Sequence, residues 1–409
     1  MKYIDQQIFI ALPVLDEWEN ITNFIQNLRN QTYKKFVLYV CVNQPDNWWN
    51  IDEKKSVCER NMLTLNYLKT ISDFKIQIID KSTKGNGWQG KQTGVGWARK
   101  ILMDAINEVA SENDIVISLD ADTTFESDYF ESIFHNFQSH QEIMAISVPY
   151  YHKLTANEAV DRAILRYEIY MRYYAINLWR ISSPFNFTAL GSAIAFPIWA
   201  YRKIGGISPM KSGEDFYFLQ KFCKTGRIIN WNSVKVYPAA RFSDRVFFGT
   251  GPAMIKGNNG DWESYPIYHY TLFDKVRESY NLFDELFEND IELPINEFIT
   301  EQFKDKLWWH PLRKNFKTKD KFVKACYEKI DGLRLLQFLK TKQALINKTD
   351  EVCLSEFFKV FYPELITVLN LDKSFNFNEL TVNVLDNLRN CLMEIEEKYQ
   401  ILDYSKKYA

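Results

Sequence analysis

Two aspartates follow a run of apolar residues near position 120. Residues 115–119, Ile-Val-Ile-Ser-Leu, predict a strand buried in the core, and Asp120 and Asp122 come directly after it. Carboxylates at this spacing can both reach one hard cation, or can divide between a cation and a hydroxyl group. Mg²⁺ and Mn²⁺ suit such a site, because Mg²⁺ uses one or two protein carboxylates and shares its other positions with water and phosphates. The alternative is a pair of turn carboxylates that cap the next helix. Their position after a core strand favours the cation site.

A second acidic pair, Glu214 and Asp215, follows Gly213 at the start of a helical pattern. Acidic residues are common at helix N-termini because they interact favourably with the helix dipole, which gives a purely structural alternative. A carboxylate held at the mouth of a sheet can instead act as a general base toward an acceptor hydroxyl. Both residues are therefore catalytic candidates.

Four basic residues near glycines are candidates for binding a diphosphate. Lys91 and Arg99 lie beside closely spaced glycines, although close helix packing with solvated side chains explains this segment equally well. Arg241 and Arg245 lie in the arginine- and glycine-rich residues 241–251. A guanidinium fork suits phosphate recognition, and glycines allow a lid to close. The alternative for this segment is a surface loop without a role.

Two other features carry weaker signals. Residues 85–90 match GxGxxG, but they follow the third predicted strand rather than the first, so a dinucleotide fold is not expected. His269 could be a third metal ligand. A histidine with satisfied hydrogen bonds beside Tyr268 and Tyr270 is the favoured interpretation.

The apolar pattern predicts an α/β fold with a mostly parallel sheet flanked by helices, followed by a mainly helical region. Strands alternate with helical segments, which is typical of parallel sheets, and ligands of such sheets bind at the carboxyl ends of the strands. Of the 15 glycines, 14 lie before residue 270, so turns that need positive φ concentrate there. The predicted strands are residues 8–12, 36–42, 75–79, 114–119, 143–148 and 191–196.

Composition excludes several classes of protein. With 50 basic and 52 acidic residues the net charge is −2, so no basic field is available to bind nucleic acid. No apolar run is long enough for a membrane span, and the N-terminus does not resemble a signal peptide. The six cysteines form no CxxC pair, which favours a reducing compartment. We expect a cytoplasmic protein, with peripheral contact at the inner face of a membrane left open.

Four motifs in order resemble family 2 glycosyltransferases with the GT-A fold. The first 250 or so residues carry the resemblance. The motifs are residues 11–17 (the opening strand and nucleotide-binding turn), 118–123 (the DxD segment), 191–206 (the acceptor-side segment) and 213–215 (the ED motif).

The resemblance implies transfer of a sugar from a nucleoside-diphosphate sugar to an acceptor hydroxyl, with inversion. It implies that Asp122 coordinates a divalent cation, Mg²⁺ or Mn²⁺, and that Asp120 contacts the ribose or the sugar of the donor. Asp215, in a motif shared with Glu214, is implied as the general base. Pro13, Leu15 and Glu17 are implied to line the nucleoside pocket.

The chain departs from the family pattern in two places. The family often carries an acidic pair after its second strand, where this chain has Asn43; Asn43 can still hydrogen-bond a base, but uridine specificity does not follow. The QxxRW signature of processive members is missing near the expected place, so a soluble, non-processive enzyme is expected. We predict a catalytic domain over residues 1–265, with a donor half to residue 122 and an acceptor half from residue 123, and a helical region over residues 266–409.

Partners and alternatives follow from the same residues. A glycan or lipid-linked acceptor and a homodimer are the partners considered. A nucleotidyltransferase could share the sheet and the acidic metal site, but a phosphate-cradling loop after the first strand is not evident. A non-catalytic subunit of a glycan pathway would not need Asp215, yet both acidic motifs are intact.

Overall fold

The computed structural model describes residues 6–211, 213–245, 249–369 and 375–406. The chain divides into two compact units. The first, here the sheet unit, comprises Met1–Ile164, Phe187–Asn259 and Gln400–Ala409. The second, here the helical unit, comprises Leu165–Asn186 and Gly260–Tyr399.

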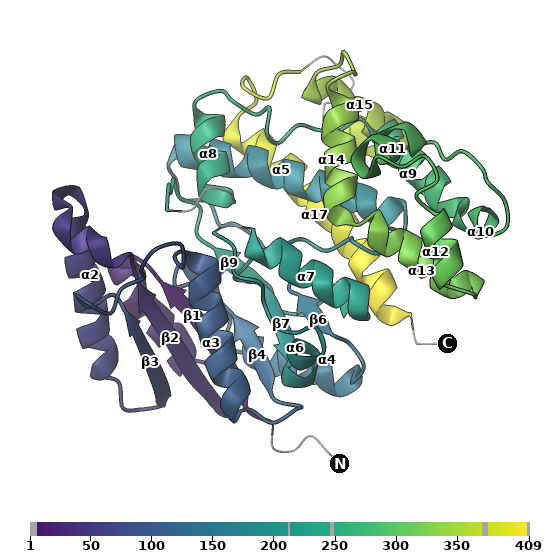
Figure 1. Ribbon diagram of the computed structural model, residues 1–409. Helices are drawn as coiled ribbons and strands as arrows, with labels where there is room; N and C mark the ends of the chain where they lie inside the picture. The colour runs from purple at the N-terminus through teal and green to yellow at the C-terminus, as the bar shows by residue number, and fades with distance from the viewer. Residues whose placement is uncertain (1–5, 212, 246–248, 370–374, 407–409) are drawn as a thin grey trace. The chain divides into compact units, whose positions relative to one another are not determined.

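The sheet unit is built on a seven-stranded sheet in the order β3-β2-β1-β4-β7-β6-β8 (Figure 1). Strands β3, β2, β1 and β4 are parallel, whereas β7 runs antiparallel to both β4 and β6. The predicted fold class, an α/β protein with a mostly parallel sheet, is therefore confirmed. The strands are β1 Ile8–Val14, β2 Phe36–Asn43, β3 Lys75–Lys81, β4 Ile115–Ser118, β6 Ala145–Ser147, β7 Ile194–Pro197 and β8 Ile228–Ile229.

The central strand β1 is buried along its whole length. An unbroken apolar run is expected of a strand in a parallel sheet, because helices cover both faces. In register, Ile8 lies between Phe36 of β2 and Ile115 of β4. The sequence predicts that this strand ends before Pro13, but it continues to Val14. Pro13 is tolerated because the pairing of β1 with β4 ends at Ala11, so no hydrogen bond to β4 is needed at the proline.

Helices cover the sheet, and α3 packs on β1 and β2 (Figure 1). Helix α8 lies within residues 241–260, a stretch that the sequence predicts to be a loop. The helices of this unit are α1 Trp18–Arg29, α2 Asp52–Lys69, α3 Val95–Val109, α4 Tyr129–Ser139, α6 Ile198–Lys203, α7 Glu214–Thr225 and α8 Thr250–Asn258, with a 3₁₀ turn η1 at Asp46–Asn50.

A second, two-stranded sheet was not predicted from the sequence. Strand β5 (Thr123–Phe125) begins one residue after Asp122 and pairs antiparallel with β9 (Val236–Pro238). Thr123 pairs with Pro238, so the chain leaving β9 passes close to the end of β4. This ribbon brings residues 241–245 beside the acidic loop.

The helical unit contains α9 to α17 and the last part of α5. The apolar pattern predicts single helices over residues 272–287, 319–343 and 354–369, and the structure divides each of them in two. Asp331 caps the N-terminus of α14, which separates α14 from α13. Pro363 is the first residue of α16, a position where a proline is tolerated, and it separates α16 from α15. The helices are α5 Glu158–Arg180, α9 Tyr270–Asn281, α10 Phe283–Leu286, α11 Asn296–Phe303, α12 His310–Asn315, α13 Lys319–Lys329, α14 Gly332–Gln343, α15 Asp350–Phe361, α16 Pro363–Val368 and α17 Val382–Ser405.

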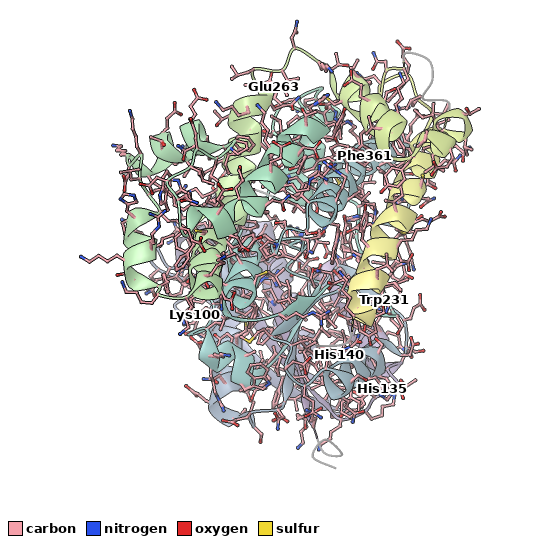
Figure 2. The ribbon with its side chains drawn as sticks, turned by 90° about the vertical axis from the view of Figure 1, so that its right-hand side faces the viewer. Lys100, His135, His140, Trp231, Glu263 and Phe361 are labelled. Carbon is pink, nitrogen blue, oxygen red and sulfur yellow. The ribbon has the colours of Figure 1, made fainter. Side chains whose placement is uncertain are left out.

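The two units do not divide where we predicted, at residue 265. The second part of α5 belongs to the helical unit, and the end of α17 returns to the sheet unit. There Arg227 Nη2 donates to the carbonyl of Asp403 at 2.8 Å. The ring of His140, labelled in Figure 2, contacts that of Tyr404 with centroids 4.7 Å apart. These contacts explain why the last turn belongs with α4 and β8.

Within the helical unit, α5 and α17 are joined by buried charges. Arg172 binds Glu168 at 2.6 Å and Glu396 at 2.8 Å, and Arg389 binds Glu168 at 3.2 Å. Both Glu168 and Arg389 have fully buried side chains.

Among the described residues, no helix is both long and apolar enough to span a bilayer.

We predict that Arg389→Met lowers the free energy of unfolding by about 3 kcal/mol, because it removes one of the two buried guanidinium groups that bind Glu168. Urea denaturation followed by circular dichroism measures the loss. Arg29→Met is the matched control, since the pair of Arg29 with Asp73 is exposed and contributes little. Equal, small effects in both variants would contradict this account of the core.

Candidate active site

The acidic loop after β4 lies at the carboxyl end of a central strand, where ligands bind in sheets of this kind. The side chains of its two aspartates reach different partners. Asp120 Oδ1 accepts from Arg99 Nη2 at 2.8 Å, and Asp122 Oδ2 lies 2.5 Å from Arg241 Nη2. The loop therefore presents two carboxylates in separate surroundings.

Arg99 is the most connected side chain of the site. It extends from α3, and its side chain is only 5 % exposed. Its Nε donates to Glu214 Oε1 at 3.0 Å, so one guanidinium binds both acidic motifs. Nη1 donates to Ser118 Oγ at 2.9 Å and to the carbonyl of Gly191 at 3.1 Å.

The second acidic pair opens α7. Gly213 precedes it with φ of 76°, a left-handed conformation that favours glycine. Asp215 Oδ1 accepts from the backbone N–H of Phe216 at 2.8 Å. Burial, helped by the negative charge of Glu214 and opposed by Arg99, raises the pKa of Asp215 to about 7. A carboxylate of this pKa is suited to accept a proton near neutral pH.

A second cluster links the end of β1 to the chain after β9. Glu17 lies 2.5 Å from both Arg241 Nη2 and Arg245 Nη1, and Arg245 Nη1 also donates to the carbonyl of Leu15 at 2.8 Å. Arg241 therefore touches Glu17 and Asp122 together. Burial raises the pKa of Glu17, with Arg245 opposing. Burial, reinforced by the charges of Glu17 and Asp120, raises the pKa of Asp122 well above its ordinary value.

The residues present fit a divalent cation that is shared with a substrate. Among the residues that the structure describes, no group of three or more His, Cys, Asp or Glu side chains forms a closed metal site. A cation held partly by phosphates needs only one or two carboxylates, and the loop after β4 carries Asp122 with Asp120 two residues before it. In the two clusters together, the acidic groups outnumber the guanidinium groups by two. The acidic groups are Glu17, Asp120, Asp122, Glu214 and Asp215, and the guanidinium groups are those of Arg99, Arg241 and Arg245.

The sequence of residues 115–266 matches the family described as Glycosyl transferase family group 2. These residues belong to the family 2 glycosyltransferases. The segment includes both acidic pairs and both arginines of the 241–245 loop, so the predicted family and the enzyme class, glycosyltransferase, are confirmed.

Two solved glycosyltransferase structures resemble the chain at low sequence identity. TarS 1–349 of S. aureus, in complex with UDP-GlcNAc, is 11% identical, with 98% of this chain and 93% of that chain covered and a TM-score of 0.39. The mannosyltransferase PcManGT of Pyrobaculum calidifontis, in complex with GDP-Man and Mn²⁺, is 13% identical, with 99% and 89% covered and a TM-score of 0.38. No curated protein sequence matches the chain.

Other predicted site residues of the glycosyltransferase lie apart from these clusters or are already engaged. Asn43 is buried; its amide donates to the carbonyl of Val14 at 2.9 Å and its oxygen accepts from Trp88 Nε1 at 3.0 Å. Lys91 is exposed, and Pro13 is buried within β1.

The glycine-rich residues 85–90 have a structural explanation. The carboxylate of Asp46 accepts from the backbone N–H groups of Gly85 at 2.7 Å and Gly87 at 3.3 Å. A Cβ on Gly87 would lie 2.6 Å from the Cα of Asp46. These glycines therefore allow the loop after β3 to approach the loop after β2.

Two predictions about the donor site and the metal need correction. Arg99 does not extend toward solvent to meet a diphosphate, because four of its hydrogen bonds are made to protein. His269 belongs to the helical unit, where Nδ1 lies 2.6 Å from Thr271 Oγ1 and Nε2 lies 2.7 Å from Glu356 Oε2. Both its nitrogens are thus engaged, as the structural alternative predicted. Of the predicted lid, residues 246–248 lie outside the described residues.

Sequence reasoning missed two features that shape the site. Ser118 and Gly191 bind Arg99 from β4 and from the segment before β7, and no spacing in the sequence relates them to a helix residue. Glu17 was predicted at a nucleoside pocket, but its observed partners include two arginines more than 220 positions away.

We predict that Glu17→Gln loosens residues 241–245, because the neutral amide cannot bind two guanidinium groups as the carboxylate does. Hydrogen–deuterium exchange should show faster exchange in residues 241–245 and little change in β1. Asn20→Ala is the matched control, since Asn20 donates to Glu17 at 2.6 Å without touching the arginines. Unchanged exchange in Glu17→Gln would show that the loop is held by other contacts.

Proposed function

We propose that the chain is an inverting, metal-assisted glycosyltransferase that moves a sugar from a nucleoside-diphosphate sugar to an acceptor hydroxyl. The observation that carries the proposal is the meeting of the two acidic pairs on Arg99: Asp120 and Glu214 bind the same guanidinium. Asp215, adjacent to Glu214, is therefore held near the loop that follows β4. The family match favours glycosyl transfer over nucleotidyl transfer.

In this proposal Asp215 is the general base. Its carboxylate accepts the proton of the acceptor hydroxyl while the hydroxyl oxygen forms a bond to the anomeric carbon. The bond from that carbon to the diphosphate breaks on the opposite face, and the electron pair leaves with the diphosphate. A single displacement of this kind inverts the configuration.

The donor side is assigned to the other carboxylates and to the loop after β9. Asp120 contacts the ribose or the sugar, and Asp122 is the residue that would hold a divalent cation. When bound, such a cation offsets negative charge on the leaving diphosphate. Arg241 and Arg245 are placed to bind the same diphosphate once they part from Asp122 and Glu17. Leu15 and Pro13 border the proposed nucleoside pocket, and the acceptor is a hydroxyl of a glycan or a lipid-linked sugar.

We predict that Asp215→Asn lowers kcat at least about 100-fold, because an amide cannot accept the proton. In the wild type, kcat/KM should rise with pH up to about 7, since Asp215 with a pKa of about 7 is protonated and inactive below that value. The assay is nucleotide release from a panel of UDP- and GDP-sugars with Mn²⁺.

Donor binding, measured by thermal shift with the same sugars, should survive in Asp215→Asn. Asp128→Asn is the matched control, because Asp128 precedes α4 and makes no side-chain cap. Full turnover by Asp215→Asn would show that the base is assigned to the wrong residue.

A separate prediction concerns the cation. Asp122→Asn should weaken Mn²⁺ binding in the presence of UDP or GDP at least about tenfold, since a ligating carboxylate is lost. Electron paramagnetic resonance of free Mn²⁺ measures this without turnover. Asp244→Asn is the control, because Asp244 is an exposed carboxylate in the segment that carries Arg241 and Arg245. Equal Mn²⁺ affinity in both variants would remove Asp122 from the metal site.

A further inference from the structure

We infer that Arg99 is a positioning residue that fixes the donor-side carboxylate Asp120 and the acceptor-side motif Glu214–Asp215 relative to each other. This inference rests on the proposed function of Asp215. It assigns Arg99 a role that differs from the diphosphate contact expected from the sequence.

The geometry around Arg99 leaves it no freedom to follow a substrate. Its four acceptors come from three segments: Ser118 and Asp120 at the end of β4, Gly191 before β7 and Glu214 in α7. Ser118 Oγ itself donates to the Gly191 carbonyl at 2.8 Å, so two of the acceptors are bound to each other. A buried guanidinium with four hydrogen bonds acts as a fixed joint between these segments.

The space around the guanidinium requires glycine at position 191. A Cβ there would lie 2.2 Å from Arg99 Nη2, a distance at which something must shift. The helix that carries Arg99 is fixed in a similar way, because a Cβ on Gly96 would lie 2.1 Å from the carbonyl oxygen of Met210. Gly96 and Arg99 are three residues apart and so lie on the same face of α3.

The charge of Arg99 acts on Asp215 through space. The charged groups that affect Asp215 are Glu214, Arg99 and Asp120; the two carboxylates raise its pKa and Arg99 lowers it, while burial raises it most. Without Arg99, three carboxylates would remain close together in a buried site. Protonated Asp215 would then persist to higher pH, and the base would be lost at neutral pH.

The test compares Arg99→Met, Arg99→Lys and Gly191→Ala, with Lys100→Met as the control, because Lys100 is the adjacent cation of α3 and pairs with Asp104 of the same helix at 2.7 Å. For the sugar nucleotide that the wild type turns over fastest, Arg99→Met should lower kcat at least about 100-fold and move the acid limb of kcat/KM up by about one pH unit or more. Arg99→Lys and Gly191→Ala keep the charge, so both should lower kcat with a smaller shift of the limb. Because Arg99 also holds the donor contact Asp120, donor KM should rise in Arg99→Met, but by a smaller factor than kcat falls.

A second readout does not depend on turnover. A carboxylate whose folded-state pKa is raised destabilises the fold as pH increases through the interval between its ordinary value and the raised one, and the effect levels off above that. The wild-type Tm should therefore fall as pH rises toward about 7 and then level off with respect to this group. In Arg99→Met the fall should continue to higher pH, and Asp215→Asn in the same background should remove the extra fall.

The outcomes separate the two proposals. A large rise in donor KM with an unmoved acid limb in Arg99→Met would show that Arg99 binds the donor and would overturn the inference. The same holds if Asp215→Asn abolishes transfer while every Arg99 and Gly191 variant keeps the wild-type pH profile. If Asp215→Asn retains full turnover, the proposed function fails first. If Arg99→Met does not fold, Arg99→Lys and Gly191→Ala still decide, since wild-type kcat in both would contradict a positioning role.

Discussion

The buried guanidinium of Arg99 is the interaction on which the rest of the site depends. A positive charge without access to water needs counterions and hydrogen-bond acceptors. Here they come from the end of β4, from the segment before β7 and from α7. The same requirement gives the two acidic motifs a common reference point, although Asp120 and Glu214 are 94 positions apart in the sequence. Pairs of carboxylates that would repel each other in isolation are thereby held close together.

On the donor side, the two-stranded ribbon β5–β9 brings the arginines of residues 241–245 to the acidic loop after β4. Each of its strands has three residues, and an isolated pair of such strands is only marginally stable in water. The pairing therefore depends on the packing of the rest of the sheet unit around it. The ribbon starts directly after Asp122 and ends three residues before Arg241. The arginine loop and the acidic loop are therefore neighbours by construction, and the charges of Glu17 and Asp122 decide where the two guanidinium groups rest.

The sequence was sufficient to predict the strands β1 to β4 and the two acidic pairs, because long buried apolar runs and carboxylates at their ends are local signals. It was insufficient for β5 and β9, whose pairing joins residues more than 110 positions apart through short, ordinary segments. Arg99 shows the limit most clearly. Its type and position on α3 are visible in the sequence, but whether it meets a diphosphate or two carboxylates depends on the distant Gly191 and Glu214. The break between α13 and α14 could not be predicted from the sequence either, because the apolar pattern continues through Asp331, which caps α14.

The division of the chain into units has a consequence for its architecture. The chain leaves the sheet unit within α5, returns at Phe187, leaves again after Asn259 and returns at Gln400 within α17. The helical unit is thus a two-part insertion rather than an appendage, and two of its helices continue without interruption into the sheet unit. Cutting the chain near residue 265 would separate Leu165–Asn186 from the helices it packs with and remove the last turn of α17 from its place beside Arg227. A graft or deletion of the helical unit therefore needs matched breaks at two places in the chain, around Leu165–Asn186 and around Gly260–Tyr399.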